Sequence, residues 1–199
     1  KKPIDNKIDV QAENIYLVKA IHDMQDGASN LKIADSSSEI IALANNQGIE
    51  DETIKKLIEE INKMKEYNIL EGTFENYEEM KLRYHIYGRE YSNLENKYLI
   101  NRIVFSTDEY EKFVEIEEKT GKIIYYVGTH KEDVTEEIGA EEVLRNYIRY
   151  LDLYIIDDWK FENRNTSTNI KFDYLMSEKA QLLSAIIETD EEERIIKQM

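Results

Sequence analysis

A predicted β-hairpin over residues 113–127 constrains the fold of this chain more than any other segment. Residues 113–116 and 122–127 are rich in β-branched and aromatic side chains, which are typical of strands. Lys119-Thr120-Gly121 lies between them, and glycine readily adopts the positive-φ backbone of a tight turn. Two such runs around a glycine turn predict paired antiparallel strands. This part of the chain therefore belongs to an antiparallel sheet.

Helical periodicity dominates the chain before this hairpin. Apolar residues recur at three- and four-residue steps, and Asp, Ser and Gly mark the expected ends. The predicted helices span residues 14–26, 36–48 and 51–64. In the third helix Glu59 lies four residues before Lys63, so we expect an ion pair between them.

From residue 82 onward the apolar period changes from helical to alternating. Strands are predicted at 82–87, 98–105, 113–116, 122–127, 159–162, 170–175, 182–188 and 194–197. One helix interrupts them after an acidic connector at 131–142. The apolar stripe of this helix consists of Val143, Leu144, Tyr147, Ile148 and Leu151. In the strand that follows we expect Trp159 and Phe161 to face the helix, and Lys160 and Glu162 to face solvent.

These elements predict an α+β protein with N-terminal helices followed by two helix-plus-antiparallel-sheet modules. The expected organisation is a leader at 1–12, the helices and first module at 13–130, and the second module at 131–199. Sequence matches at an offset of 87, such as Leu57 with Leu144 and Phe74 with Phe161, favour an internal duplication. In the second module the offset falls to 72, where 194–196 matches 122–124.

The strongly acidic composition argues against nucleic-acid binding. The 199 residues include 26 Lys and Arg against 42 Asp and Glu, a formal charge of -16. Such a chain repels phosphate at long range. Residues 43–58 do show the Ala-Gly-aliphatic spacing of a helix-turn-helix, but the expected recognition helix begins Glu50-Asp51-Glu52. We therefore expect a protein or peptide partner and no nucleic acid.

The residue inventory offers little catalytic or metal chemistry. There is no Cys, and the three histidines, His22, His85 and His130, are far apart in the sequence. The nearest approach to a ligand cluster is His130 with Glu132 and Asp133 in the acidic connector. We expect no cofactor, no metal and no catalytic residues, and a hydrolase is the third-ranked interpretation.

Tyrosine is the over-represented residue, with 14 copies. The notable aromatic group is Tyr147, Tyr150, Tyr154 and Trp159. One interpretation is a helix–sheet interface whose hydroxyl groups reach water at its rim. The other is an aromatic patch that binds a partner.

The segment VEIEEKTGKII at 114–124 resembles the hairpin of PepSY-type domains, in which an acidic-apolar strand, a Thr-Gly turn and a returning apolar strand recur. The second module has Asp190-Glu191-Glu192 where the first has Thr-Gly. The resemblance implies small helix-plus-sheet modules of bacterial envelope and secreted proteins, often membrane-anchored and commonly regulatory or inhibitory. The Lys, Ile and Asn bias with one Pro resembles that of low-GC Gram-positive bacteria.

The expected function is therefore a non-catalytic, extracytoplasmic interaction or regulatory protein. The chain begins with Lys1-Lys2-Pro3, and we expect an upstream membrane anchor or signal segment whose basic flank these lysines would form. The alternative is a cytosolic regulator that uses segment 43–58 to bind DNA or protein.

Overall fold

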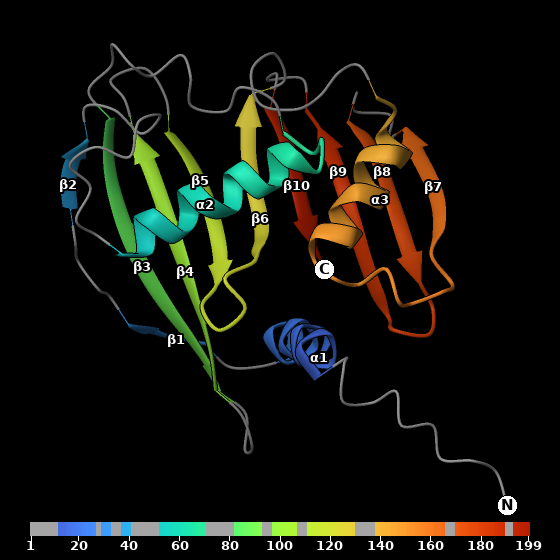
Figure 1. Ribbon diagram of the computed structural model, residues 1–199, viewed down its shortest axis with the longest axis horizontal. Helices are drawn as coiled ribbons and strands as arrows, with labels where there is room; N and C mark the ends of the chain where they lie inside the picture. The colour runs from blue at the N-terminus through green and yellow to red at the C-terminus, as the bar shows by residue number, and fades with distance from the viewer. Residues whose placement is uncertain are drawn as a thin grey trace, which may run out of the picture.

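The structure is a computed structural model of the 199-residue chain (Figure 1). It describes residues 12–26, 29–32, 37–40, 52–70, 82–92, 97–106, 111–129, 138–165, 170–189 and 193–199.

The described strands form one antiparallel sheet built from two meanders. The first comprises β3 (Leu82–Ser92), β4 (Lys97–Ser106), β5 (Glu111–Glu117) and β6 (Ile123–Thr129). The second comprises β7 (Lys160–Asn165), β8 (Lys171–Ser177), β9 (Leu182–Glu188) and β10 (Glu193–Gln198). The last strands of the two meanders, β6 and β10, pair with each other, so the order is β3-β4-β5-β6-β10-β9-β8-β7. The α+β class is thereby confirmed, with both meanders in a single sheet.

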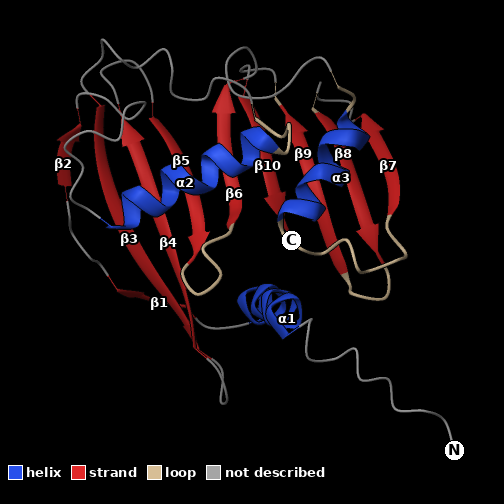
Figure 2. Ribbon diagram, viewed as in Figure 1, coloured by secondary structure: helices blue, strands red, loops and turns tan. Residues whose placement is uncertain are grey.

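Two helices cover the same face of this sheet. These are α2 (Glu52–Glu66), which crosses the strands of the first meander, and α3 (Ala140–Tyr150), which lies over β8 and β9 (Figures 1 and 2). The predicted apolar stripes of both helices are buried: Leu57, Ile61 and Met64 in α2, and Val143, Leu144, Tyr147 and Ile148 in α3. The third helix, α1 (Ala12–Asp26), lies at the lower end of the strands as drawn in Figure 1.

The helix expected from residue 36 is wrong at its start. Residues Ser37–Ile40 form a strand, β2, which pairs with β3 from Ser37 opposite His85 to Ile40 opposite Leu82. A second short strand, β1 (Ser29–Lys32), pairs with the far end of β3. The serine and acidic residues here resemble a helix cap, but the hydrogen bonds that both short strands form with the backbone of β3 outweigh this local preference for a helix. Residues 41–51 lie outside the described ranges.

Both sheet-covering helices end in the same capping arrangement. Asn68 after α2 and Asp152 after α3 have left-handed backbone, with φ values of 54° and 59°. The next N–H, of Ile69 and Leu153, donates to the helix carbonyl five residues back at 2.9 and 2.8 Å. This is a Schellman motif, which satisfies carbonyls at the end of a helix. The two caps are 84 residues apart, whereas the sequence matches have an offset of 87. The duplication itself stays a prediction.

The predicted hairpin forms β5 and β6, and its turn has a counterpart in the second meander. Gly121 in the first turn has φ 71°, and Gln181 in the turn between β8 and β9 has φ 50°. The residue that ends the preceding strand accepts hydrogen bonds from turn N–H groups in both cases: Glu117 from Thr120 (2.7 Å) and Ser177 from Ala180 (3.0 Å). The matching turn therefore lies at 178–181, whereas the sequence placed the counterpart of Thr-Gly at 190–192, outside the described ranges.

Candidate partner-binding site

The structure separates the four aromatic residues that the sequence grouped. Tyr147 and Tyr150 are buried, with 0% and 1% exposure, so they belong to the core and cannot form a surface patch. Tyr154 is 60% exposed, and Trp159 is half-buried. The helix–sheet interface is thus the observed role of the first pair, and only Tyr154 and Trp159 remain available to a partner.

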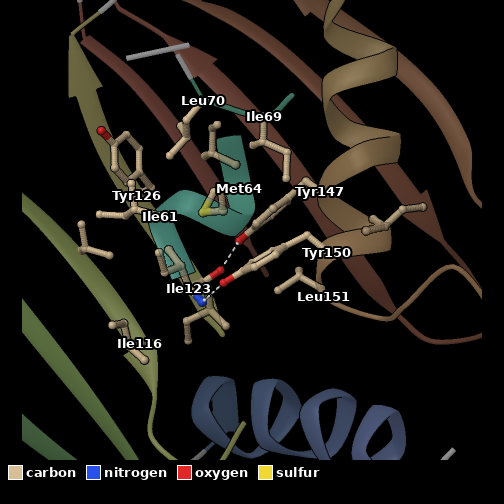
Figure 3. Packing of buried hydrophobic residues seen from close by; sticks show 14 of the residues in the cluster. Ile61, Met64, Ile69, Leu70, Ile116, Ile123, Tyr126, Tyr147, Tyr150 and Leu151 are labelled. Atoms are coloured by element: carbon tan, nitrogen blue, oxygen red, sulfur yellow. Dashed lines mark hydrogen bonds between the residues drawn. The ribbon is translucent and has the colours of Figure 1, made fainter. Parts of the chain in front are cut away.

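The two buried tyrosines bind the backbone of the first residue of β6 (Figure 3). The Tyr147 hydroxyl donates to the Ile123 carbonyl at 3.0 Å, and the Tyr150 hydroxyl accepts from the Ile123 N–H at 2.8 Å. The Tyr150 hydroxyl also donates to Glu60 Oε2 of α2 at 2.7 Å. These bonds connect α3 to Ile123 at the start of β6, and through Tyr150 they also connect α2 to the same position. Both hydroxyl groups therefore have a structural role.

Glu60 is a buried carboxylate that the sequence did not single out. It is 6% exposed, and its other oxygen accepts from the Lys63 ammonium. The expected Glu59–Lys63 pair is wrong, because the Lys63 ammonium bonds to Glu60, three residues before it, and not to Glu59. Burial, and then the negative charge of Glu60, raise the pKa of Tyr150 well above its ordinary value. Tyr150 consequently stays protonated and acts as a donor to Glu60.

A surface pocket lies where the end of α3 meets the following loop. Its volume is about 240 Å³. The lining combines two arginines from α3, two aromatic rings, two aliphatic side chains and one carboxylate: Arg145, Ile148, Arg149, Tyr154, Ile156, Asp157 and Trp159. The Trp159 indole N–H donates to the Leu153 carbonyl at 3.1 Å, which fixes the ring at the pocket wall.

Among the described residues, one guanidinium group of this pocket has no acidic partner. Arg145 pairs with Glu141 at 2.7 Å, and Asp157 pairs with Lys179 at 2.5 Å. Arg149 donates only a long 3.4 Å bond to the Asn146 side chain, and no carboxylate of the described ranges pairs with it. A guanidinium beside aromatic rings can hold a carboxylate through two parallel hydrogen bonds. The pocket can therefore bind an acidic group.

Neither arginine was predicted as a site residue, although their spacing in the sequence places them together. Arg145 and Arg149 are four residues apart on the polar side of a predicted helix, a spacing that places them on one face. Both are exposed in the structure. Their convergence with Tyr154 and Trp159 depends on the capped turn after α3, which the helical pattern alone does not predict.

The other sequence candidates lie elsewhere or outside the described ranges. His22 Nε2 lies 2.8 Å from the Ala180 carbonyl oxygen, and residues 130–137, with His130, Glu132 and Asp133, are not among those described. In the part of the chain that is described, no group of three or more His, Asp or Glu side chains could hold a metal ion. The segment expected to be a recognition helix is α2, which packs Leu57 and Ile61 into the core.

Comparisons with protein-family models, with curated proteins and with solved structures found no match to this chain. The PepSY-type resemblance therefore remains an expectation. None of the described helices has the length and apolar character needed to cross a membrane.

Proposed function

We propose that this chain is a non-catalytic interaction or regulatory protein that binds an acidic peptide segment in the pocket of Arg149 and Tyr154. The observation that supports this is the Arg149 guanidinium, which has no carboxylate partner among the described residues although the chain carries a charge of -16. An arginine in so acidic a chain would be expected to find an acidic neighbour. Tyr154, 60% exposed beside it, supplies an aromatic surface for the rest of the segment.

The hydrogen bonds of the buried polar groups favour a non-catalytic role, because these groups bind one another or the backbone. Glu60 and Tyr150 bind each other, and Glu117 accepts bonds from the Lys119 and Thr120 N–H groups and from the Tyr16 hydroxyl. General acid–base work needs a titratable group that can reach a substrate. These groups are buried and hold helices and turns in place.

The proposed location is outside the cytoplasm, with the chain attached to the membrane of a Gram-positive-type bacterium through a preceding segment. The location rests on the resemblance of the 114–124 hairpin to PepSY-type domains, and the type of bacterium on the Lys, Ile and Asn bias of the sequence. In that setting an acidic module that recognises a peptide segment would act as a regulator or inhibitor of another envelope protein.

Selection from a random peptide library displayed on phage tests the pocket. We expect enriched peptides to contain Asp or Glu next to an aromatic or aliphatic residue. Arg149→Ala and Tyr154→Ala should each remove this enrichment. Arg164→Ala is the matched control, because Arg164 is an exposed arginine on β7, paired with Glu162 at 3.8 Å. Enrichment of acidic peptides that survives Arg149→Ala would contradict the proposal.

A further inference from the structure

The sheet face opposite α2 and α3 carries a continuous row of apolar side chains. Directly paired residues of antiparallel strands share a face. The pairs on this side are Val104–Phe113, Val127–Ile195, Ile195–Ile187 and Ile187–Phe172. The Phe113 ring stacks on that of Tyr125 with 5.1 Å between the ring centroids, and Tyr125 is two residues before Val127, so the first pair lies on the same side as the rest. The row crosses β4, β5, β6, β10, β9 and β8 in that order.

This row lies outside the main core cluster that the helices cover. Its members are Val104, Phe113, Val127, Ile195, Ile187 and Phe172, and none of them belongs to the main core cluster. All are half-buried except Val127, which is 7% exposed. Six strands at about 4.8 Å spacing give the row a length of about 24 Å, which matches about 16 residues of α-helix.

A lysine side chain, that of Lys197, lies in the next row of the same face. Lys197 is opposite Tyr125 on β6 and Ala185 on β9. Arg102, on the same face, is already paired with Glu115. Its backbone belongs to the sheet, but no side chain of the described residues pairs with the Lys197 ammonium group. Burial lowers the pKa of Lys197, as expected for an ammonium group that apolar neighbours shield from water.

One helix of this chain already packs at the lower end of this face. The Tyr16 hydroxyl of α1 donates to Glu117 at 3.0 Å, and the Tyr16 ring lies 5.4 Å from that of Tyr98. Ile21 and Met24 of α1 line a pocket of about 150 Å³ whose other walls include Tyr125. The face therefore accepts a helix, and the apolar row lies beyond the part that α1 occupies.

We propose that the apolar row binds an amphipathic helix of a partner protein, with an acidic side chain of that helix on Lys197. Such a helix would cross the strands with its apolar stripe on the row. A carboxylate beside the stripe would complement the one ammonium group on this face that lacks a partner among the described residues. This surface lies on the opposite side of the sheet from α3 and is independent of the Arg149 pocket.

Two designed 18-residue helical peptides test this surface with the full chain. Both have a Leu and Ile stripe, and they differ only in one central residue beside it, Glu or Lys. By fluorescence anisotropy, wild-type protein should bind the Glu peptide about two- to fivefold more tightly, as expected for a partly exposed ion pair. Lys197→Glu should reverse this preference, and Arg149→Ala should leave it unchanged.

The preference is measured with two peptides on the same variant. A general loss of stability in Lys197→Glu would weaken both peptides and would therefore not produce a reversed preference. Binding of the Glu peptide should also protect the backbone amides of β10 from hydrogen exchange. An unchanged preference in Lys197→Glu would overturn the proposal. So would concentration-dependent dimerisation through this face without binding of either peptide.

Discussion

The hydroxyl group of Tyr150 in α3 donates a 2.7 Å hydrogen bond to the carboxylate of Glu60 in α2, 90 residues earlier in the chain. The same hydroxyl accepts from the Ile123 N–H at the start of β6. β6 in turn pairs with β10, the last strand of the second meander. The Tyr150 side chain therefore connects α2 and α3 to β6, the strand at which the first meander joins the second.

Tyr150→Phe should destabilise the protein by about 2–4 kcal/mol, because it leaves a buried carboxylate oxygen and a buried N–H group unpaired. The free energy of unfolding from urea melts measures this. Tyr154→Phe is the matched control and should change stability by less than about 0.5 kcal/mol, since Tyr154 is exposed. Equal effects of the two changes would show that the bond to Glu60 contributes nothing.

Alkaline pH should destabilise the fold through the buried tyrosines. Burial raises the pKa of both Tyr147 and Tyr150 above the value of about 10 for an unfolded tyrosine. Above about pH 10 the unfolded chain loses these protons while the native chain keeps them, so the free energy of unfolding falls as pH rises. Below about pH 10 this contribution is fully present.

Urea melts between pH 8 and 11 check the alkaline effect. Tyr147→Phe should flatten the decline above pH 10, since the variant has one fewer buried hydroxyl group to deprotonate. A decline as steep as that of the wild-type protein would contradict the assignment.

Helices and strands that are specified by the local pattern of apolar residues and turn glycines could be predicted from the sequence. The 113–127 hairpin carries its own turn glycine, and the stripes of α2 and α3 repeat at helical spacing. The strands β1 and β2 were not predictable, because four residues gain their stability from pairing with β3 and not from local propensity. Only part of the pocket could be predicted. Tyr154 and Trp159 are notable in the sequence, whereas the sequence does not show that Asp157, the acidic residue of the pocket, pairs with Lys179 and that no described carboxylate pairs with Arg149.

Gly121→Ala should destabilise the protein by about 1 kcal/mol. The backbone φ of 71° is strained for a residue with a Cβ. Beyond the two chain neighbours, no atom of the described residues lies within 4 Å of the position that this Cβ would occupy, so the cost is one of backbone conformation. Gly139→Ser is the contrasting change, because Gly139 caps α3 at φ -66° without a side-chain bond. It should stabilise by about 0.3 kcal/mol. Thermal melts that give both changes the same sign would contradict the turn assignment.

Phe161→Ala should destabilise more than Lys160→Ala. Phe161 is paired with Leu175 on the helix-covered face and packs against the core, whereas Lys160 is exposed. Because Phe161 is only half-buried, we expect about 2–3 kcal/mol for Phe161→Ala, below the range for fully buried phenylalanine. Lys160→Ala should stay under about 0.5 kcal/mol. The reverse order in urea melts would place β7 one residue out of register.

The same melts test the duplication through Phe74, which lies outside the described ranges. If residues 74 and 161 are equivalent, Phe74→Ala should destabilise the protein about as much as Phe161→Ala. A silent Phe74→Ala would remove that match and favour the offset of 84 given by the two helix caps.

A double-mutant cycle between Arg149 and the acidic residue of a selected peptide tests the proposed function most directly. Calorimetric titration would compare the peptide and its Glu→Gln analogue on wild-type and Arg149→Ala protein. The account predicts a coupling energy of about 1 kcal/mol, with Arg149→Ala weakening the acidic peptide about fivefold and the Gln analogue hardly at all. A coupling energy of zero, with both peptides weakened equally, would contradict recognition of an acidic segment by Arg149.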